Sequence, residues 1–321
     1  MASEQQHKIG SGFGAKTTAE EVMAGVDLTG RLAVVTGGYS GIGTETTRAL
    51  AAAGAHVVVP ARRPDAAREA LAGIDGVEVA ELDLGDLDSV AAFAEDFLAS
   101  GRSIDILIDS AAIMASPLMR VGPGWEAQFA TNHLGHFALA NRLWPLLAAD
   151  GGARVVALSS AGHRRSAIRF DDLMFESGYD KWAAYGQAKT ANVLFAVQLD
   201  ALGQDAGVRA FAVNPGGILT PLQRHLPREE MVALGWVDAA GRPLQRFKTT
   251  EEGAATATWC ATSPQLAGMG GVYCEDCDIA APTTDEDATT GVRAYATDTE
   301  AAARLWTVSA ELTGVNAFAV A

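Results

Sequence analysis

From Leu28 onward the chain repeats one pattern: a short apolar segment, a Gly- or Asp-rich turn, and then an Ala- and Leu-rich segment. The short segments are apolar throughout rather than alternating with polar residues, which is typical of strands covered on both faces in a parallel sheet. The pattern therefore predicts an α/β fold, a doubly wound parallel sheet of the Rossmann type with about seven strands and helices on both faces. Strands are expected at Leu32–Thr36, His56–Val59, Val77–Leu82, Ile104–Ile108, Arg154–Leu158 and Val208–Val213, and helices at Ile42–Ala53, Leu87–Ser100 and Glu126–Leu147.

The pattern divides the chain into an N-terminal arm and one domain. Residues 1–26 are polar and contain glycine, with a short helix expected at Thr18–Ala24, and residues 27–321 form the single Rossmann domain. Two long segments, 161–184 and 216–249, interrupt the alternation. Long loops in a compact domain are usually lids or binding loops, so both are predicted to be substrate loops.

The end of the chain departs from the pattern in a different way. Residues 275–300 are acidic and rich in turn-forming residues, so we expect a solvated excursion there. A last helix is predicted at Glu300–Leu312.

Charge and composition exclude several classes of protein. The chain has 39 acidic and 24 basic residues and a net charge of −15, so its surface repels nucleic-acid phosphates. Three cysteines are too few for a disulfide framework and fit a reducing compartment. No apolar run is long enough to span a membrane, and the first residues lack the apolar core of a secretory signal. We expect a cytoplasmic protein, with a homo-oligomer left open, that binds no nucleic acid and has no membrane span.

A glycine-rich turn follows the first predicted strand. It reads Thr36-Gly37-Gly38-Tyr39-Ser40-Gly41-Ile42-Gly43 and leads directly into a helix. Glycine lets the backbone approach a pyrophosphate closely, and the helix N-terminus offers free N–H groups to it. The alternative is a glycine-rich turn without a ligand, which the position between the first strand and the first helix disfavours. The turn predicts a dinucleotide site.

Two arginines at the end of the second strand favour one dinucleotide over the other. An acidic residue there binds the adenosine ribose of NAD, whereas an arginine binds the 2′-phosphate of NADP. The chain has Arg62 and Arg63 there, and no acid before Asp65. NADP(H) is therefore the predicted cofactor and NAD(H) the less favoured one, unless both arginines are ordinary surface cations. Asp83 follows the third strand and is expected at the adenine edge.

Tyr185 and Lys189 form a candidate acid-base pair. They are four residues apart on a predicted helix and so share one face of it. A neighbouring ammonium favours phenolate, which would lower the pKa of the phenol toward a useful range. Such a spacing alone is common by chance. It gains weight from the glycine turn, from Asn132, and from Ser159-Ser160 at the end of the fifth strand, where this fold places catalytic groups.

With these motifs in this order, the chain resembles the short-chain dehydrogenase/reductase superfamily from about Asp27 to Leu312. The sequence Asn132-His133-Leu134-Gly135-His136-Phe137 and the long interval between Ser160 and Tyr185 make it most similar to the retinol dehydrogenase and WW-domain oxidoreductase branch. Further markers of that branch are Ala61-Arg62, Asp276-Cys277 and Leu305-Trp306.

The resemblance implies roles for four catalytic residues and a cofactor site. Tyr185 would be the general acid/base, and Lys189 would bind the nicotinamide ribose. Ser160 would bind the substrate oxygen, and Asn132 would hold a backbone kink and a water leading to Lys189. The cofactor-binding residues would be Gly37, Tyr39, Ser40, Gly41, Ile42, Gly43, Arg62, Asp83, Leu84, Ser110, Ala111, Ala112, Tyr185, Lys189, Pro215, Gly216, Ile218 and Thr220.

The chain departs from the family after the fourth strand. The family has Asn-Asn-Ala-Gly there, and this chain has Asp109-Ser110-Ala111-Ala112. We expect Ala112 to add a methyl group where the backbone lies close to the cofactor. Asp109 would bring a charge to the centre of the fold, which could weaken or shift cofactor binding.

Other motifs favour no further chemistry. His133 and His136 could ligate a metal, but packing is the favoured interpretation, and no metal is expected. Cys274 and Cys277 have the spacing of a redox or zinc pair without a partner pair. Apolar loop residues would either fix the loops to the body or line a substrate pocket together with Ile113 and Met114; they are Phe170, Met174, Phe175, Tyr179, Trp182, Leu222, Leu226, Met231 and Trp236.

The predicted function is an NADP(H)-dependent oxidoreductase that interconverts an alcohol and a ketone or aldehyde on a medium-sized, largely apolar molecule. One alternative is a non-catalytic NADP-binding interaction protein that retains the fold. A second is a serine hydrolase using Ser160 and His163, although neither serine of the Ser159-Ser160 pair is flanked by glycines in the hydrolase pattern.

Overall fold

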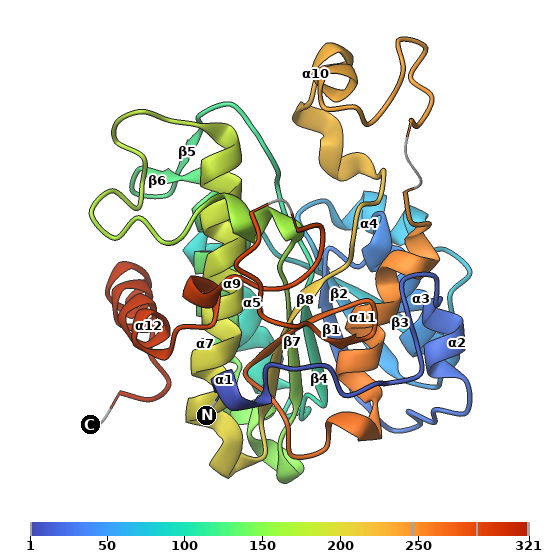
Figure 1. Ribbon diagram of the computed structural model, residues 1–321. Helices are drawn as coiled ribbons and strands as arrows, with labels where there is room; N and C mark the ends of the chain where they lie inside the picture. Colours follow the sequence, from blue (N-terminus) through green and yellow to red (C-terminus); the bar gives the residue numbers. More distant parts are fainter. Residues whose placement is uncertain (1, 245–246, 287, 320–321) are drawn as a thin grey trace.

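The computed structural model describes residues 2–244, 247–286 and 288–319 (Figure 1). Within these ranges one sheet has the strand order β10-β9-β8-β7-β4-β1-β2-β3. All neighbouring strands in it are parallel except β10, which pairs antiparallel with β9. Its strands are β1 (Leu32–Thr36), β2 (His56–Ala61), β3 (Val77–Glu81), β4 (Ile106–Asp109), β7 (Arg154–Leu158), β8 (Arg209–Asn214), β9 (Val272–Glu275) and β10 (Asp278–Ile279). The predicted Rossmann-type sheet is confirmed, with seven parallel strands and one short antiparallel edge strand.

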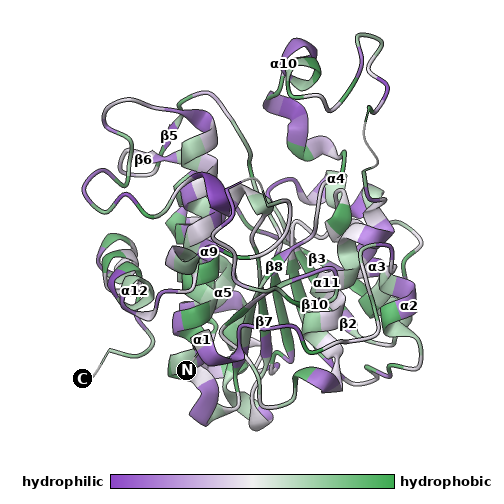
Figure 2. Cartoon of the chain, in the orientation of Figure 1, coloured by the Kyte–Doolittle hydropathy of each residue, from purple (hydrophilic) through white to green (hydrophobic). Residues whose placement is uncertain are grey.

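Successive residues of each central strand enter different hydrophobic cores. Val34 of β1 and Leu107 of β4 pack into the core on one face, whereas Val35 and Ile108, next to them in the chain, pack into the core on the other. These strands are fully buried, so both faces of the sheet are apolar, as Figure 2 shows. Continuous apolar runs were therefore the right signal for this sheet.

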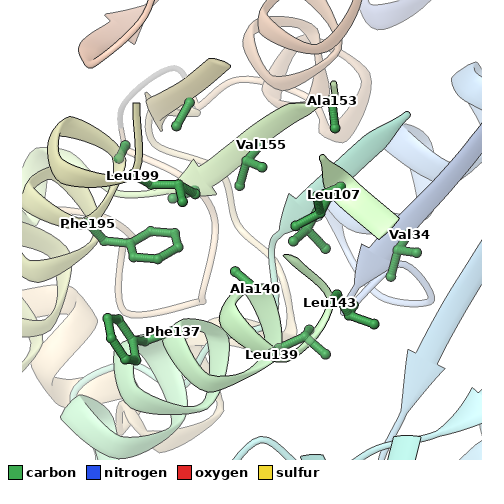
Figure 3. Close-up of a cluster of buried hydrophobic side chains, with 14 of the residues drawn as sticks. Val34, Leu107, Phe137, Leu139, Ala140, Leu143, Ala153, Val155, Phe195 and Leu199 are labelled. Carbon is green, nitrogen blue, oxygen red and sulfur yellow. The ribbon is translucent and has the colours of Figure 1, made fainter. Parts of the chain in front are cut away.

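Helices cover both faces of the sheet. The first core lies under α5, α7 and α9, where Phe137 and Phe195 face Val155 of the sheet (Figure 3), and the second lies under α2, α3 and α11. The α-helices are α1 (Ala2–Gln5), α2 (Ala19–Met23), α3 (Ile42–Ala52), α4 (Pro64–Ala70), α5 (Leu87–Ala99), α6 (Ala127–Phe129), α7 (Gly135–Arg142), α8 (Trp144–Leu147), α9 (Lys181–Gly203), α10 (Arg228–Ala233), α11 (Thr250–Thr262) and α12 (Thr299–Thr313).

Short elements connect these helices and strands. The 3-10 helices are η2 (Ala149–Gly151), η3 (Ala161–Arg165), η4 (Gln204–Ala206), η5 (Pro221–His225), η6 (Pro264–Leu266) and η7 (Ala294–Ala296), and η1 (Ala130–Leu134) is a π-helical turn. A two-stranded hairpin joins β5 (Arg120–Val121) and β6 (Trp125–Glu126).

Side-chain caps start the helices next to the site and at the end of the chain. Asp180 precedes α9 and accepts hydrogen bonds from the N–H groups of Trp182 and Ala183 at 3.1 and 2.7 Å. Asp298 accepts from the N–H of Ala301 at 2.7 Å at the start of α12. Such caps satisfy backbone donors that the first helical turn leaves free.

The predicted helix at Glu126–Leu147 is wrong as one continuous element. The backbone is helical over nearly this whole span, but the turn around Asn132 widens into the π-helical η1 between α6 and α7, and Leu143 separates α7 from α8. Gly135 lies against the segment that follows β3. A Cβ at Gly135 would be 2.2 Å from the carbonyl oxygen of Leu84 in that segment. The backbone kink that the family resemblance implies at Asn132 is this turn.

The N-terminal arm packs against the domain. The amide nitrogen of Gln6 donates to the carbonyl oxygens of Tyr273 and Ala280 at 2.9 and 2.7 Å, and its side-chain oxygen accepts from the N–H of Tyr273. Val22 of α2 joins the second core. The arm thus extends the edge of the sheet and covers one of its faces.

The expectation of a solvated excursion at residues 275–300 holds for residues 281–286 and 288–290, which are mostly exposed, but not for the stretch before them. Glu275 ends β9, which pairs with β8, and Cys277, Ile279 and Val292 are buried. The reversal between β9 and β10 is made by Asp276 and Cys277, both with positive φ. Acidic residues in this segment therefore form a tight turn and accept hydrogen bonds, for example Glu275 from the N–H of Gly291 at 2.6 Å.

Candidate active site

A cavity of about 900 Å³ opens at the carboxyl ends of the parallel strands. The turn after β1 and the residues that follow β2, β4, β7 and β8 all contribute to its wall, together with α9. Every predicted site residue lines it except Gly43 and Asn132; those lining it are Gly37, Tyr39, Ser40, Gly41, Ile42, Arg62, Asp83, Leu84, Ser110, Ala111, Ala112, Ser160, Tyr185, Lys189, Pro215, Gly216, Ile218 and Thr220. The fold thus brings a set of residues scattered over the sequence to one hollow.

The glycine turn is shaped by close backbone contacts. Gly37 has φ +67°, and a Cβ there would lie 2.8 Å from the Cα of Ala111. A Cβ at Gly43 would lie 2.2 Å from the carbonyl oxygen of Gly37, so this glycine lets α3 approach the turn and does not itself line the cavity. The N-terminus of α3 begins at Ile42 and faces the cavity, so its first N–H groups can receive a phosphate.

The end of β2 is basic. Arg62 and Arg63 are exposed and line the cavity. In the described parts of the chain neither guanidinium is within ion-pair distance of a carboxylate. Asp83 lies further along the wall, where its Oδ1 accepts a hydrogen bond from the N–H of Gly85 at 2.9 Å.

Tyr185 and Ser160 meet at the inner end of the cavity. Tyr185 is 4% exposed, and Gly162 lies so close to it that a Cβ there would be 2.7 Å from the ring. The Ser160 oxygen accepts from the N–H of Gly162 at 3.0 Å, which fixes the serine at the start of η3. Burial raises the pKa of Tyr185 to about 12, and its hydrogen bond with Ser160 partly opposes this shift.

The pKa of Tyr185 is raised in this structure, whereas its spacing from Lys189 leads us to expect a lowered value. Burial lowers the pKa of Lys189 to about 7. Its ammonium nitrogen donates to the carbonyl oxygen of Leu158 at 2.8 Å and lies 5.7 Å from the centre of the Tyr185 ring. The i, i+4 spacing does place both groups on one face of α9, but the closest partner of the lysine is the end of β7.

Asn132 lies behind the cavity wall. Its side-chain oxygen accepts from the N–H of Ile113 and its nitrogen donates to the carbonyl of Ile113, both at 2.9 Å. The π-helical turn thus holds the backbone that follows β4. Asn132 acts on the site through this segment, and the described geometry gives it no direct contact with the cavity.

Burial opposes the charge that the sequence leads us to expect from Asp109 at the centre of the fold. It is 1% exposed, and neither carboxyl oxygen has a hydrogen-bond partner in the described residues. Burial raises its pKa well above the usual value, which favours the neutral acid. His136 lies 4.0 Å away, but its pKa is lowered to about 4 by burial, and its Nε2 is hydrogen-bonded to Thr36 at 2.8 Å.

An apolar wall stands next to Tyr185. The buried residues Met114, Ala115, Tyr185 and Leu226 form one cluster, with Leu222, Met231, Trp182 and Trp236 packed against it. The Trp182 ring lies edge-on to both Tyr185 and Trp236, at 6.5 and 6.0 Å between centroids. Segment 216–249, which contains η5 and α10, supplies much of this wall and stands above the sheet in Figure 1.

Glu230 of α10 joins the second loop to α9. It accepts hydrogen bonds from the ammonium of Lys181 and from the indole nitrogen of Trp182. At its base the loop is closed by the N–H of Lys248, which donates to the carbonyl of Gly217 at 2.9 Å. The segment, called the lid below, is therefore attached to α9 through Glu230, called the latch, and is closed at its base while it lines the cavity.

Most of the first predicted substrate loop does not reach the cavity. Only its ends line it, through η3 and Trp182. Ile168, Phe170, Leu173 and Met174 pack instead on a hydrophobic cluster formed with Phe129 and α12, Phe175 is buried, and Tyr179 donates to the carbonyl of Ser116. The middle of segment 161–184 is fixed to the body, so its apolar residues form core rather than pocket.

Several cavity residues were not singled out in the sequence. Phe247 and Arg165 are next to the aromatic wall, with the Arg165 guanidinium 4.9 Å from the Trp182 ring. Arg224 enters from η5 at the opposite end. Each is an isolated loop residue without a motif, so the sequence offered no signal for them.

The histidines and cysteines have structural surroundings. The ring of His133 shares a hydrogen bond of 2.8 Å with Ser309, and burial lowers its pKa to about 3. Cys260, Cys274 and Cys277 are buried thiols. The parts of the chain that are described contain no group of three metal-ligating side chains, and none of the helices seen there is long and apolar enough to cross a membrane.

Comparison with known proteins agrees with this architecture. The sequence profile of the family described as short chain dehydrogenase matches residues 31–231. A Streptomyces lividans protein named "Probable oxidoreductase" is 48% identical over 296 residues, which cover 89% of this chain and 98% of that protein. Retinol dehydrogenase 12 from Bos taurus is 38% identical over 298 residues, covering 91% and 89%.

Solved structures show the same fold. A Mycobacterium paratuberculosis protein superposes with a TM-score of 0.71 at 33% identity, covering 93% of this chain and 98% of that one. The Pseudomonas aeruginosa RhlG/NADP active-site complex superposes with a TM-score of 0.60 at 25% identity, covering 78% and 95%.

The fold and the cavity thus define a Rossmann-type oxidoreductase. The chain belongs to the short-chain dehydrogenase/reductase family, close to its retinol dehydrogenase branch, as the profile and the relatives show. It is an enzyme of the family that uses NAD(P) cofactors.

Proposed function

We propose that this enzyme is NADP(H)-dependent and interconverts an alcohol and a ketone or aldehyde on a medium-sized, largely apolar molecule. The observation that carries the proposal is the position of Tyr185, whose ring belongs both to the cavity wall shared with Ser160 and to the apolar cluster under the lid. A proton carrier and an apolar binding surface therefore meet at one point.

The cavity has the features that a dinucleotide phosphate requires. Gly37 and Gly43 leave no room for a Cβ, and the N-terminus of α3 faces the hollow that they shape. Arg62 and Arg63 supply uncompensated positive charge at the β2 end, which favours a 2′-phosphate over a free ribose hydroxyl. The NADP complex of Pseudomonas aeruginosa RhlG supports this choice by analogy.

Tyr185 would exchange a proton with the substrate oxygen. A bound NADPH supplies the hydride, and a bound NADP⁺ accepts one. The hydroxyl of Ser160 would hold the same oxygen by a hydrogen bond, so that the carbonyl carbon faces the cofactor side of the cavity. Lys189, placed one helical turn from Tyr185, would bind ribose hydroxyls, and Asn132 would maintain the segment after β4 that supports this geometry.

The lid would exclude water from the reacting atoms. Leu222, Trp236 and Phe247 of the lid line the cavity, and Leu222 and Trp236 belong to the same apolar cluster as Met114 and Trp182. Such a wall favours apolar substrates and offers few polar groups for orientation other than Ser160 and Tyr185.

The proposal is tested by NADPH oxidation with panels of ketones and aldehydes matched in reactive group and graded in apolar size. We expect turnover that increases with apolar size up to the capacity of the cavity. Tight NADPH binding without oxidation of the cofactor by any carbonyl compound would instead favour the non-catalytic interaction protein. Preference for small charged carbonyls would contradict the apolar assignment of the cavity.

A further inference from the structure

Three arginines converge at the adenosine end of the cavity, and one of them comes from the lid. Arg62 and Arg63 follow β2, and Arg224 belongs to η5. All three line the same cavity, together with Tyr39 of the glycine turn. The residues that would recognise the cofactor phosphate and the segment that covers the substrate therefore share one wall.

The charges of these arginines are uncompensated. Within the described ranges no carboxylate lies at ion-pair distance from any of the three guanidinium groups. Arg224 makes one weak hydrogen bond, from its Nη1 to the carbonyl of Pro221 at 3.3 Å. Burial lowers the pKa of Arg224, and the positive charges of Arg62 and Arg63 lower it further. Asp83 and Glu286 line the same cavity but are not at ion-pair distance from these groups. Three cations without a directly paired carboxylate favour a multiply charged anion.

The segment that carries Arg224 is firmly positioned beside the glycine turn. A Cβ at Gly41 would lie 3.1 Å from the Cβ of Thr220, so the two segments are in contact. Thr220 caps η5 by accepting from the N–H of Leu222 at 3.2 Å, and Gln223 donates to the carbonyl of Ile218 at 2.8 Å. The backbone that carries Arg224 is therefore held beside the glycine turn by these hydrogen bonds, while the Arg224 side chain itself is exposed.

We propose that Arg224 is a third phosphate-recognising residue, which grips the 2′-phosphate of the adenosine ribose together with Arg62 and Arg63 and thereby draws the lid onto the bound cofactor. This rests on the proposed use of NADP(H). A ribose phosphate monoester carries close to two negative charges and three acceptor oxygens, enough for several guanidinium groups. Phosphate recognition at one end of the cavity would then stabilise the cover over the substrate end.

The chain offers a matched control on the same lid. Arg242 is 81% exposed on its side chain, pairs with Asp238 and does not line the cavity. Arg242→Ala and Arg224→Ala each remove one positive charge from the lid. A difference between the two variants therefore reports position and not net charge.

Dissociation constants are measured by intrinsic fluorescence for NADP⁺, NAD⁺ and 2′,5′-ADP with the full-length wild type and the variants. We expect Arg224→Ala to weaken NADP⁺ and 2′,5′-ADP roughly 10- to 100-fold, as for loss of a charged phosphate contact. NAD⁺ affinity should change less than threefold. Arg224→Lys should weaken NADP⁺ binding less than Arg224→Ala does, and Arg242→Ala should bind NADP⁺ as tightly as the wild type. In hydrogen exchange, 2′,5′-ADP should protect residues 221–233 of the wild type but not of Arg224→Ala.

The outcomes distinguish the choice of cofactor from the role of Arg224. Equal wild-type affinity for NADP⁺ and NAD⁺ would overturn the choice of cofactor and the role of Arg224 with it. Wild-type preference for NADP⁺ that Arg62→Ala abolishes and Arg224→Ala leaves intact would overturn the role of Arg224 alone. Protection of residues 221–233 by NAD⁺ as strong as by NADP⁺ would show that the phosphate does not draw in the lid.

Discussion

The ammonium nitrogen of Lys189 is hydrogen-bonded to the carbonyl of Leu158 at 2.8 Å, at the end of the strand that leads to Ser160. The lysine thus connects α9 to β7 directly behind the reacting residues. Its burial lowers its pKa to about 7, while burial of Tyr185 raises the pKa of the phenol to about 12. Burial therefore shifts the two pKa values in opposite directions, because it favours the neutral form of each group.

Replacing Lys189 should increase thermal stability and weaken NADPH binding. Because the pKa of Lys189 is lowered in the fold, the unfolded chain binds a proton that the folded chain lacks between about pH 7 and 10.5. This contribution to stability therefore increases with pH across that window and is lost as pH falls through 7. Lys189→Met, free of cofactor, should gain most thermal stability over the wild type below pH 7 and least near pH 10, and should bind NADPH more weakly. Uniformly lower stability would show that the bond to Leu158 outweighs burial.

Asp109 should make stability depend on pH in the opposite direction. Its folded pKa is raised, so its contribution to stability is fully present below about pH 4 and is lost as pH increases toward the folded pKa. Asp109→Asn removes the ionisable group from the same site. Melting temperatures of the two proteins should converge near pH 4 and diverge in favour of the variant at pH 7–8. Parallel curves would mean that Asp109 is charged in the fold.

The Glu230 latch should govern substrate affinity. Glu230→Ala removes the acceptor for Lys181 and Trp182, whereas Glu229→Ala alters its exposed neighbour and serves as the control. A partly buried ion pair and one hydrogen bond are together worth on the order of 1–2 kcal/mol, so KM for an apolar substrate should increase roughly three- to tenfold with a smaller change in kcat. Amide exchange should become faster in residues 221–244 and stay unchanged in 166–180. Equal KM values in both variants would show that Glu230 does not control substrate affinity.

Much of the fold could be predicted because local sequence determines it. The runs that form β1 and β7 are apolar except for Thr36 and Arg154 at one end of each, and both strands lie where the runs predict them. The glycine turn is equally local, since the Cβ positions of Gly37 and Gly43 are blocked by nearby backbone. β9 was missed because its short run, Val272–Glu275, leads into a turn at Asp276 that reads as a loop.

The features that escaped prediction depend on distant partners. An apolar residue such as Phe170 has the same sequence signature whether it lines a cavity or packs on α12, and here it packs on α12. The ionisation of Asp109 and Lys189 depends on burial, which the sequence does not state. Arg224 stands out only because the fold brings it near Arg62, which is far away in the chain. The π-helical turn at Asn132 lies in a stretch whose sequence pattern is helical on both sides.

The role of Tyr185 as proton carrier is tested most directly by comparing Tyr185→Phe with Tyr179→Phe. Burial raises the pKa of both tyrosines to about 12, but only Tyr185 lines the cavity, while the Tyr179 hydroxyl donates to the carbonyl of Ser116. Turnover of the best carbonyl substrate should fall roughly 10²- to 10⁴-fold in Tyr185→Phe, with NADPH affinity within a factor of two or so of the wild type. Tyr179→Phe should keep wild-type turnover. If Tyr185→Phe retains a tenth of wild-type turnover or more, the proton carrier lies elsewhere.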